Sequence, residues 1–366
     1  ASVIGVTDPV YYSDYLHLEQ LLSSQKLASA EAGSPVHDEM LFIIVHQAYE
    51  LWFKQILWEL AAVADLLRRD RVDEMQMLRI VAHLDRITEI QKLLLDQISV
   101  LETMTPLDFL EFRNYLIPAS GFQSVQFRLI ENRLGMRPQD RMRLAGAPYT
   151  AALSDADRAL AEQSEKETSL FELIEAWLQR TPFLDLGDFH FWEAYKAAVW
   201  EMLEHDRQIV ATNPNLTEEE REAQLRSFDQ TFGLYEAVFD ETKHKELVEA
   251  GERRLSHRAF QAALFINLYR DEPALQEPFR LLMRLMDIDE GFTTWRYRHA
   301  LMTTRMIGRK VGTGGSAGAA YLTRSAERSR VFLDLFQLST FMIRRSSLPA
   351  LPPEVERAMR FRFEEA

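Results

Sequence analysis

Hydrophobic residues recur along this chain with the spacing of α-helices, and no segment shows the regular alternation of an amphipathic strand. Two long apolar stripes predict helices over about 38–67 and 72–104. Shorter helices are predicted where a capping residue precedes an apolar repeat, at Thr105, Ser120, Ser169, Thr217 and Ser256. The pattern therefore predicts an all-α protein with long core helices.

Three other helices are expected from apolar stripes with weaker boundary signals. The first runs through Tyr12, Tyr15 and Leu22, the second is capped by Asp289 and ends near Ile307, and a final long helix includes Val331 and neighbouring apolar residues. Residues 136–166 have mixed charge and no clear period, which indicates a linker or an irregular insertion.

The stretch 38–60 combines the highest apolarity with polar groups in unusual places. Residues 40–45 are apolar on every side of a helix, and His46, Gln47 and Glu50 follow within the same run. Burying such groups without partners costs about 1–3 kcal/mol each. Local hydrogen bonds or a polar ligand must therefore compensate them.

Composition narrows the classes of protein that fit. The 366 residues carry a formal net charge of −14, which argues against general affinity for nucleic acid or anionic membranes. There is no cysteine, which excludes disulfides, iron–sulfur clusters and thiolate-ligated haem. The first residues lack the basic and apolar regions of a signal peptide, and no apolar run approaches the ~20 residues of a membrane span. We expect a soluble, cytoplasmic protein.

Two of the nine histidines are candidates for chemistry. No pair has the HxxxH or HExxH spacing of a zinc protease, but a haem needs only one axial imidazole from the protein. His46 follows Phe42 by one helical turn, and His299 follows Trp295 by one turn. The alternative for each is a core histidine whose ring is hydrogen-bonded to a backbone carbonyl.

Arg113 follows Phe109 by one turn, and an arginine beside aromatic residues suits a bidentate grip on a carboxylate. The alternative is a surface salt bridge with Glu111 or Asp108. The glycine-rich stretch 312–318 lacks the phosphate-loop and dinucleotide patterns, but it offers Thr313 to a ligand. Its alternative is a flexible linker.

Four blocks, taken in order, resemble the tryptophan 2,3-dioxygenase family. They span about residues 11–345, whereas 136–250 matches weakly. The blocks are Tyr12-Ser-Asp-Tyr15-Leu16, the stretch from His37 to Trp52, the stretch from Phe109 to Ser124, and Trp295-Arg-Tyr-Arg-His299 through Gly312-Thr313-Gly-Gly-Ser-Ala-Gly318. The combination is far more specific than any single motif.

The resemblance implies one all-helical haem domain over residues 1–366, with a weaker-matching helical insertion at about 136–250. It also implies a homotetramer, a dimer of dimers, with one haem b per subunit. His299 would be the axial ligand of the haem iron, with Trp295 beside it, and Ser120 and Gly121 would line the distal side. The activity implied is haem-dependent insertion of O2 across the indole C2=C3 bond of L-tryptophan, which gives N-formyl-L-kynurenine in the kynurenine pathway.

Further roles follow from the same resemblance. His46 would be the catalytic distal histidine that accepts the indole N–H, and Arg113 would bind the substrate carboxylate. Thr313 would contact the ammonium and carboxylate groups. The remaining residues would enclose the substrate, with Phe42 and Phe109 as walls of the indole pocket and Tyr12, Tyr15 and Leu16 contributed by a neighbouring subunit.

Some positions depart from the usual pattern of the family, among them Ala317, Ala319-Ala320, the run from Met302 to Arg305, and Phe109, which is tyrosine in some bacterial members. Two alternative functions follow. One is a related haem monooxygenase of a natural-product pathway that converts tryptophan or β-methyltryptophan to an oxindole. The other is a sensor without turnover, against which the intact set of His299, His46, Arg113 and Thr313 argues.

Overall fold

The computed structural model describes residues 9–141, 148–182, 191–308, 310, 322 and 328–360. Every regular element in these ranges is a helix, so the all-α prediction is confirmed. The α-helices are α1 (Tyr12–Tyr15), α2 (Leu18–Leu22), α3 (Ala28–Glu31), α4 (Glu39–Leu67), α5 (Glu74–Leu101), α6 (Pro106–Arg113), α7 (Val125–Leu134), α8 (Asp155–Ser164), α9 (Leu170–Gln179), α10 (Phe191–Thr212), α11 (Glu218–Phe239), α12 (Glu241–Glu249), α13 (His257–Leu268), α14 (Pro273–Ile307), α16 (Leu333–Gln337) and α17 (Pro353–Met359). The 3-10 helices are η1 (Asn114–Leu116), η2 (Gly121–Gln123), η3 (Pro138–Asp140), η4 (Tyr149–Ala152), η5 (Leu338–Phe341) and η6 (Arg345–Ser347).

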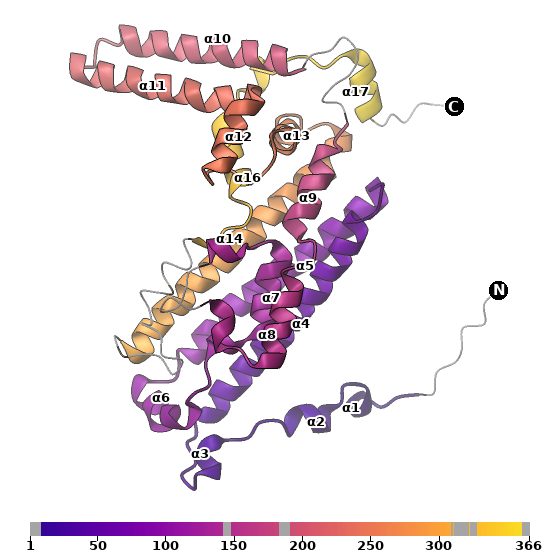
Figure 1. The fold of residues 1–366 in the computed structure, drawn as a ribbon, viewed down its shortest axis with the longest axis vertical. Coiled ribbons are helices and arrows are strands. Elements are labelled where there is room, and N and C mark those ends of the chain that lie inside the picture. Colours follow the sequence, from indigo (N-terminus) through magenta and orange to yellow (C-terminus); the bar gives the residue numbers. More distant parts are fainter. Residues whose placement is uncertain are drawn as a thin grey trace, which may run out of the picture.

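Three long helices, α4, α5 and α14, run side by side through the body of the molecule (Figure 1). Helix α5 packs along both α4 and α14. Its approach to α14 is close at Gly291, where a Cβ atom would lie 2.6 Å from the side-chain oxygen of Gln91. The amide of Gln91 donates to the carbonyl of Ile288 at 2.9 Å, so the absent side chain at 291 lets a polar bond join the two helices.

Side-chain caps set several helix starts as the sequence predicts. Thr105, Ser169 and Thr217 each accept a hydrogen bond from the third residue of α6, α9 and α11, whose acidic side chain bonds back to the cap. Gly135 ends α7 with φ of 115°, a conformation that other residues rarely adopt. Local sequence chemistry therefore fixes the ends of these elements.

The prediction that Asp289 caps a helix is wrong. Helix α14 begins at Pro273, and Asp289 is a buried residue in its middle. The Asp289 carboxylate accepts hydrogen bonds from the backbone N–H groups of Val331, at 2.9 Å, and Phe332, at 3.1 Å. It thus holds the segment that precedes α16, and Val331 of that segment lies 42 residues further along the chain.

Three other boundary predictions need correction. His17, at φ of 50°, breaks the expected first helix into α1 and α2. The expected final long helix is only the short α16 followed by η5. Ser120 starts the 3-10 turn η2, while Ser124 caps α7. Apolar stripes at these places mark buried faces of short turns, which periodicity alone does not distinguish from a long helix.

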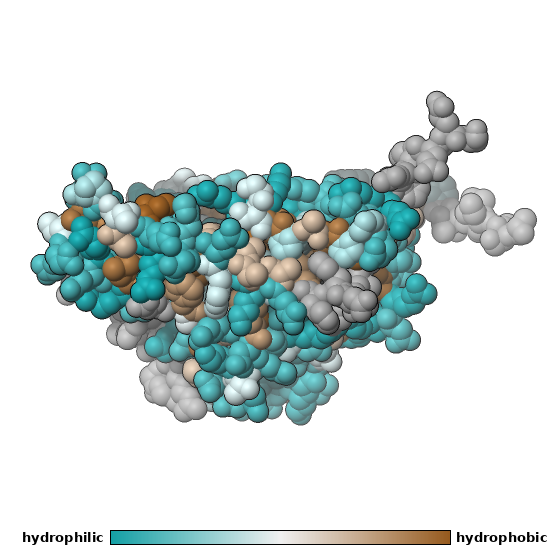
Figure 2. Space-filling view, turned by 90° about the horizontal axis from the view of Figure 1, so that it is seen from above, coloured by the Kyte–Doolittle hydropathy of each residue, from teal (hydrophilic) through white to brown (hydrophobic). Residues whose placement is uncertain are grey.

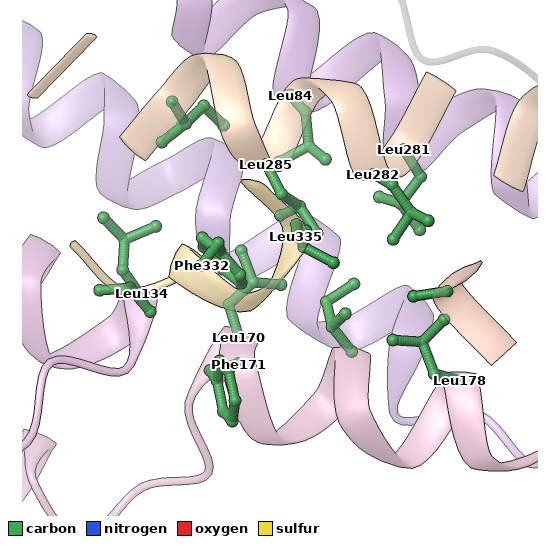
Figure 3. Close-up of a cluster of buried hydrophobic side chains, with 14 of the residues drawn as sticks. Leu84, Leu134, Leu170, Phe171, Leu178, Leu281, Leu282, Leu285, Phe332 and Leu335 are labelled. Atoms are coloured by element: carbon green, nitrogen blue, oxygen red, sulfur yellow. The ribbon is translucent and has the colours of Figure 1, made fainter. Parts of the chain in front are cut away.

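Leucine and phenylalanine side chains fill the space between α5, α9, α14 and α16, as Figure 3 shows. Leu84, Leu178, Leu281 and Leu285 are almost wholly inaccessible to solvent. Each such side chain contributes about 1.5–3 kcal/mol by its burial. This core holds the long helices rigidly beside one another.

Helices α10 and α11 form an antiparallel pair that projects from one end of the molecule, and the N-terminal segment extends away from the other (Figure 1). The face seen in Figure 2 is largely hydrophilic, with hydrophobic side chains scattered over it. Within the described residues, no helix is long and apolar enough to cross a membrane.

Candidate functional site

A cavity of about 290 Å³ lies between α4, α5, α6, α7 and α14. Its walls are mostly aromatic and aliphatic, with a few charged groups and two histidines among them. The residues that line it include Phe42, His46, Tyr49, Glu50 and Phe53 of α4, Phe109 and Arg113 of α6, Ser120 and Gly121 before α7, Phe127, Arg128 and Glu131 of α7, and Trp295, Arg296 and His299 of α14. An apolar cavity with few polar groups is typical of a ligand site.

Helix α4 presents one face to this cavity, because residues 42, 46, 49, 50 and 53 recur at helical spacing. The rings of Phe42 and His46 are 4.0 Å apart. The Phe42 ring also lies 5.9 Å from that of Phe109, so the two phenylalanines form a continuous aromatic wall across α4 and α6. The polar residues that stood out in the sequence thus border a cavity.

The tautomer of His46 follows from its one hydrogen bond. Nδ1 lies 2.7 Å from the carbonyl oxygen of Phe42, and because a carbonyl only accepts, Nδ1 carries the proton. Nε2 of the neutral ring is then an acceptor, and no described residue donates to it. Burial lowers the pKa of His46, against opposing effects of the Phe42 carbonyl and the Glu50 charge. His46 is therefore a neutral acceptor in the cavity wall.

His299 faces the same cavity from α14. Its ring stacks on that of Trp295, with centroids 5.3 Å apart and planes 10° from parallel. Within the described part of the chain, its ring nitrogens have no hydrogen-bond partner. Burial lowers the pKa of His299 to about 4, with a further lowering by His46. A neutral imidazole with an open nitrogen is the form that binds a metal ion.

Trp295 is itself held by aromatic neighbours. Its ring lies 5.9 Å from that of Tyr49 and 5.2 Å from that of Phe127. The Tyr49 hydroxyl donates to the carbonyl of Leu94 at 2.6 Å, and burial raises the pKa of Tyr49 to about 12. The buried indole N–H of Trp295 faces the Tyr49 hydroxyl and partly counters the effect of burial on the Tyr49 pKa. The aromatic neighbours therefore set the plane against which His299 stacks.

Arg113 ends α6 and is half-buried at the cavity wall. One of the acids proposed as its surface partner, Asp108, is committed elsewhere, because its carboxylate binds the N–H and the hydroxyl of Thr105 at 3.1 and 2.5 Å. The capping box therefore positions the helix that carries Phe109 and Arg113. The arrangement places a guanidinium group beside an aromatic wall.

A cluster of three arginines around Glu131 is a feature that the sequence reading missed. Glu131 binds Arg128 at 3.0 Å and Arg296 at 2.5 Å, and Arg141 forms a third ion pair with it. Burial opposes ionisation of Glu131, but the arginines outweigh it and hold the pKa of this carboxyl well below its usual range. Arg128 and Arg296 line the cavity, so this part of its wall carries an excess of positive charge.

The sequence contains one indication of this cluster, which also fits a pair of residues on the surface. Arg128 and Glu131 are three residues apart, a spacing that usually indicates a solvated surface pair. Arg296 comes from a helix 165 positions away, so only the fold reveals that one carboxylate serves both.

The other polar residues of α4 have partners. Gln126 of α7 donates from its amide to the Glu50 carboxylate at 2.9 Å and to the Glu50 carbonyl at 2.8 Å. Gln47 accepts from Gln25 at 2.7 Å, which ties α4 to the segment after α2. Local hydrogen bonds thus compensate part of the burial cost that the sequence indicates.

The predicted site residues of the N-terminal segment lie away from this cavity. Tyr12, Tyr15 and Leu16 do not line the cavity of their own chain, and the two tyrosines are 75% and 74% exposed. Thr313 lies outside the described residues. In the described ranges, no group of three or more histidine, aspartate or glutamate side chains is arranged to hold a metal ion.

Comparison with known proteins identifies the relatives of this chain. The family model described as tryptophan 2,3-dioxygenase matches residues 5–342. Proteins named tryptophan 2,3-dioxygenase from Alteromonas mediterranea and Bdellovibrio bacteriovorus are 47% and 48% identical, each over 97% of this chain and 98% and 99% of the relative. The protein of that name from Xenopus tropicalis is 48% identical over 94% of this chain and 85% of its own length.

Proposed function

Because this chain belongs to the tryptophan 2,3-dioxygenase family, we propose that it is the oxidoreductase that converts L-tryptophan and O2 to N-formyl-L-kynurenine. The observation that carries the proposal is one cavity bordered by two neutral imidazoles, His46 and His299, with the guanidinium of Arg113 at its wall. The reaction cleaves the indole C2=C3 bond, adds both atoms of O2 to the product and consumes no external reductant.

The residues of the cavity fit a haem b, one per subunit. His299 offers an open imidazole nitrogen for the iron, and Trp295 stacks along that ring. Arg128 and Arg296 supply positive charge that suits the two carboxylates of a haem. Ser120 and Gly121 would line the distal side, where a small side chain and a glycine leave room. When bound, the haem supplies the iron that activates O2.

The chain's own residues would bind and orient the substrate. A zwitterionic amino acid needs a cation for its carboxylate, which Arg113 offers, and a polar group near its ammonium, for which Thr313 is the candidate. The flat indole needs apolar walls, and Phe42 and Phe109 form one. Its N–H needs an acceptor, and Nε2 of His46 is open.

His46 then acts by orientation rather than as a strong base. Its lowered pKa keeps the ring neutral, so Nε2 accepts the indole N–H without taking the proton in the ground state. Holding the indole in one pose aligns its C2=C3 bond with the oxygen to be inserted. The wall of Phe42 and Phe109 shields one side of the same space from water.

Assembly into a homotetramer, a dimer of dimers, is part of the proposal. It is supported by an N-terminal segment that extends away from the body with exposed tyrosines at 12 and 15 (Figure 1). Exposed tyrosines on an extended segment are typical of residues that pack on a partner, here the cavity of a neighbouring subunit. A cytoplasmic location and a single domain over residues 1–366 remain predictions.

Turnover of the reduced holoenzyme tests the proposal. The haem-loaded protein is reduced without oxygen, mixed with L-tryptophan and then exposed to O2, and the products are separated by mass. N-formyl-L-kynurenine is the expected product. An oxindole with one added oxygen atom would support the monooxygenase alternative, and unchanged tryptophan would overturn both enzyme functions.

A further inference from the structure

Glu50 is a charged residue in the cavity wall that the proposed reaction does not use. It follows His46 by one turn of α4, so both side chains lie on the face that lines the cavity. Gln126 of α7 binds one of its carboxylate oxygens, Oε2, at 2.9 Å. The other oxygen has no partner among the described residues, and no arginine forms an ion pair with this carboxylate there.

The second carboxylate of the cavity wall, that of Glu131, forms ion pairs with arginines. Glu131 is surrounded by Arg128, Arg141 and Arg296, so its charge is more than neutralised. Arg113 faces the cavity from α6, and His299 faces it from α14. Among these groups Glu50 is the acid whose negative charge acts on His46, where it raises the pKa of the ring against the effect of burial.

A more basic nitrogen is a stronger hydrogen-bond acceptor. A ring nitrogen that accepts a hydrogen bond takes on part of a positive charge, and burial disfavours such charge on His46. A carboxylate one turn away stabilises that charge and so strengthens the hydrogen bond that Nε2 accepts. The amide of Gln126 holds the same carboxylate at the cavity wall.

We propose that Glu50 is a positioning residue, which acts through His46 to strengthen the hydrogen bond that Nε2 accepts from the indole N–H of the substrate. This inference rests on the proposed function, since it takes an indole amino acid as the ligand. It assigns Glu50 no contact with the substrate. Its role is to stabilise the partial positive charge that the His46 ring takes on when Nε2 accepts the N–H, because an apolar cavity disfavours that charge.

The variant Glu50→Gln tests the inference, because the glutamine carbonyl still accepts from Gln126 while the charge is lost. Equilibrium binding to the deoxygenated, haem-loaded protein is measured for L-tryptophan and for benzothienylalanine, an isostere in which sulfur replaces the indole N–H. The dissociation constant for tryptophan is expected to rise roughly three- to tenfold. That for benzothienylalanine is expected to change less than about twofold, because the ligand has no N–H to donate.

Two matched comparisons separate this role from a structural one. Glu59→Gln removes another buried carboxylate of α4, one that binds His83 and Arg86 and does not line the cavity, and should leave the affinity for tryptophan unchanged. In a His46→Ala background, Glu50→Gln should add no further loss, because the residue through which it acts is gone.

Equal weakening of both ligands by Glu50→Gln would show a merely structural role and overturn the inference, as would an unchanged affinity for tryptophan. Binding is measured without turnover, so the result is independent of the product. A wild-type protein that binds tryptophan but forms no N-formylkynurenine would overturn the proposed function while the comparison of the two ligands still decides the role of Glu50. Absence of tryptophan binding by the wild type would overturn both.

Discussion

Two pairs of histidines in this molecule have different surroundings, one pair at a helix junction and the other in the wall of the cavity. At the junction of α12 and α13, Nε2–H of His244 donates to the carbonyl of Leu255 at 2.8 Å and its Nδ1 accepts from Arg253 at 3.0 Å. Nearby, Nε2–H of His257 donates to the carbonyl of Val238 at 2.8 Å. In the cavity, by contrast, His46 uses only Nδ1, and His299 uses neither nitrogen in the described structure.

The contrast shows which property marks a functional histidine. Burial lowers the pKa of His46 and of His244 alike, so a perturbed pKa does not separate the pairs. A backbone hydrogen bond does not separate them either, because His46 also has one. What differs is a ring nitrogen left open toward a cavity, which is a position for a ligand.

The largest effect is expected for His299→Ala. Loss of the open imidazole should abolish stoichiometric haem binding, measured as the Soret band during titration of the protein with haem. His257→Ala is the matched control and should bind haem normally. A normal Soret band in His299→Ala would remove this residue as the axial ligand.

Two arginines differ in the same way, Arg113 at the cavity wall and Arg253 in the interior beside His244. Arg113→Ala should raise the KM for tryptophan roughly ten- to a hundredfold, because a charge-assisted pair with the substrate carboxylate contributes about 1.5–3 kcal/mol. Arg253, which is 4% exposed and lies 4.1 Å over the ring of Phe260, is the control. Its replacement by alanine should lower the melting temperature and leave KM unchanged in the folded enzyme. An unchanged KM in Arg113→Ala would exclude Arg113 from the carboxylate site.

For His244→Ala we expect a lower free energy of unfolding, by about 1–3 kcal/mol, because the carbonyl of Leu255 and the Arg253 guanidinium each lose the hydrogen bond that they make with the ring. Denaturant titration measures this loss. Affinity for haem and tryptophan should not change. A large loss of ligand affinity at full stability would contradict the structural role assigned to His244.

The smallest effect is a dependence on pH. The pKa of His46 is below its ordinary 6.5, so the ring stays neutral and Nε2 accepts at neutral pH. As the pH falls through the lowered pKa, Nε2 takes up a proton and can no longer accept the indole N–H, so KM should rise. Steady-state measurements from pH 8 to about 5 check this. In His46→Ala that rise in KM should disappear, and its persistence would assign the titration to another group.

Much of the fold could be predicted because it depends on local chemistry. Thr105, Ser169 and Thr217 cap helices through residues only three positions away. Asp289 misled the prediction because an acid ahead of an apolar stripe favours a helix start, whereas its real partners, Val331 and Phe332, are distant in sequence. When a side chain binds backbone groups that are distant in sequence, the residues next to it do not reveal its partners.

The residues of the candidate site also divide into those that could be predicted from the sequence and those that could not. Phe42 and His46, one turn apart, could be grouped from sequence, and the resemblance to a family joined them to Arg113 and His299, which line the same cavity. The arginines around Glu131 and the bond between Glu50 and Gln126 could not be predicted, because each joins helices whose packing the sequence does not specify. These missed residues set the charge of the cavity wall.

The mass of the product formed under isotopically labelled O2 shows whether both atoms of O2 enter tryptophan. We expect N-formylkynurenine that carries two labelled oxygen atoms when the reduced, haem-loaded protein is the catalyst. An oxindole product that carries one labelled atom, or tryptophan recovered without label, would contradict this expectation.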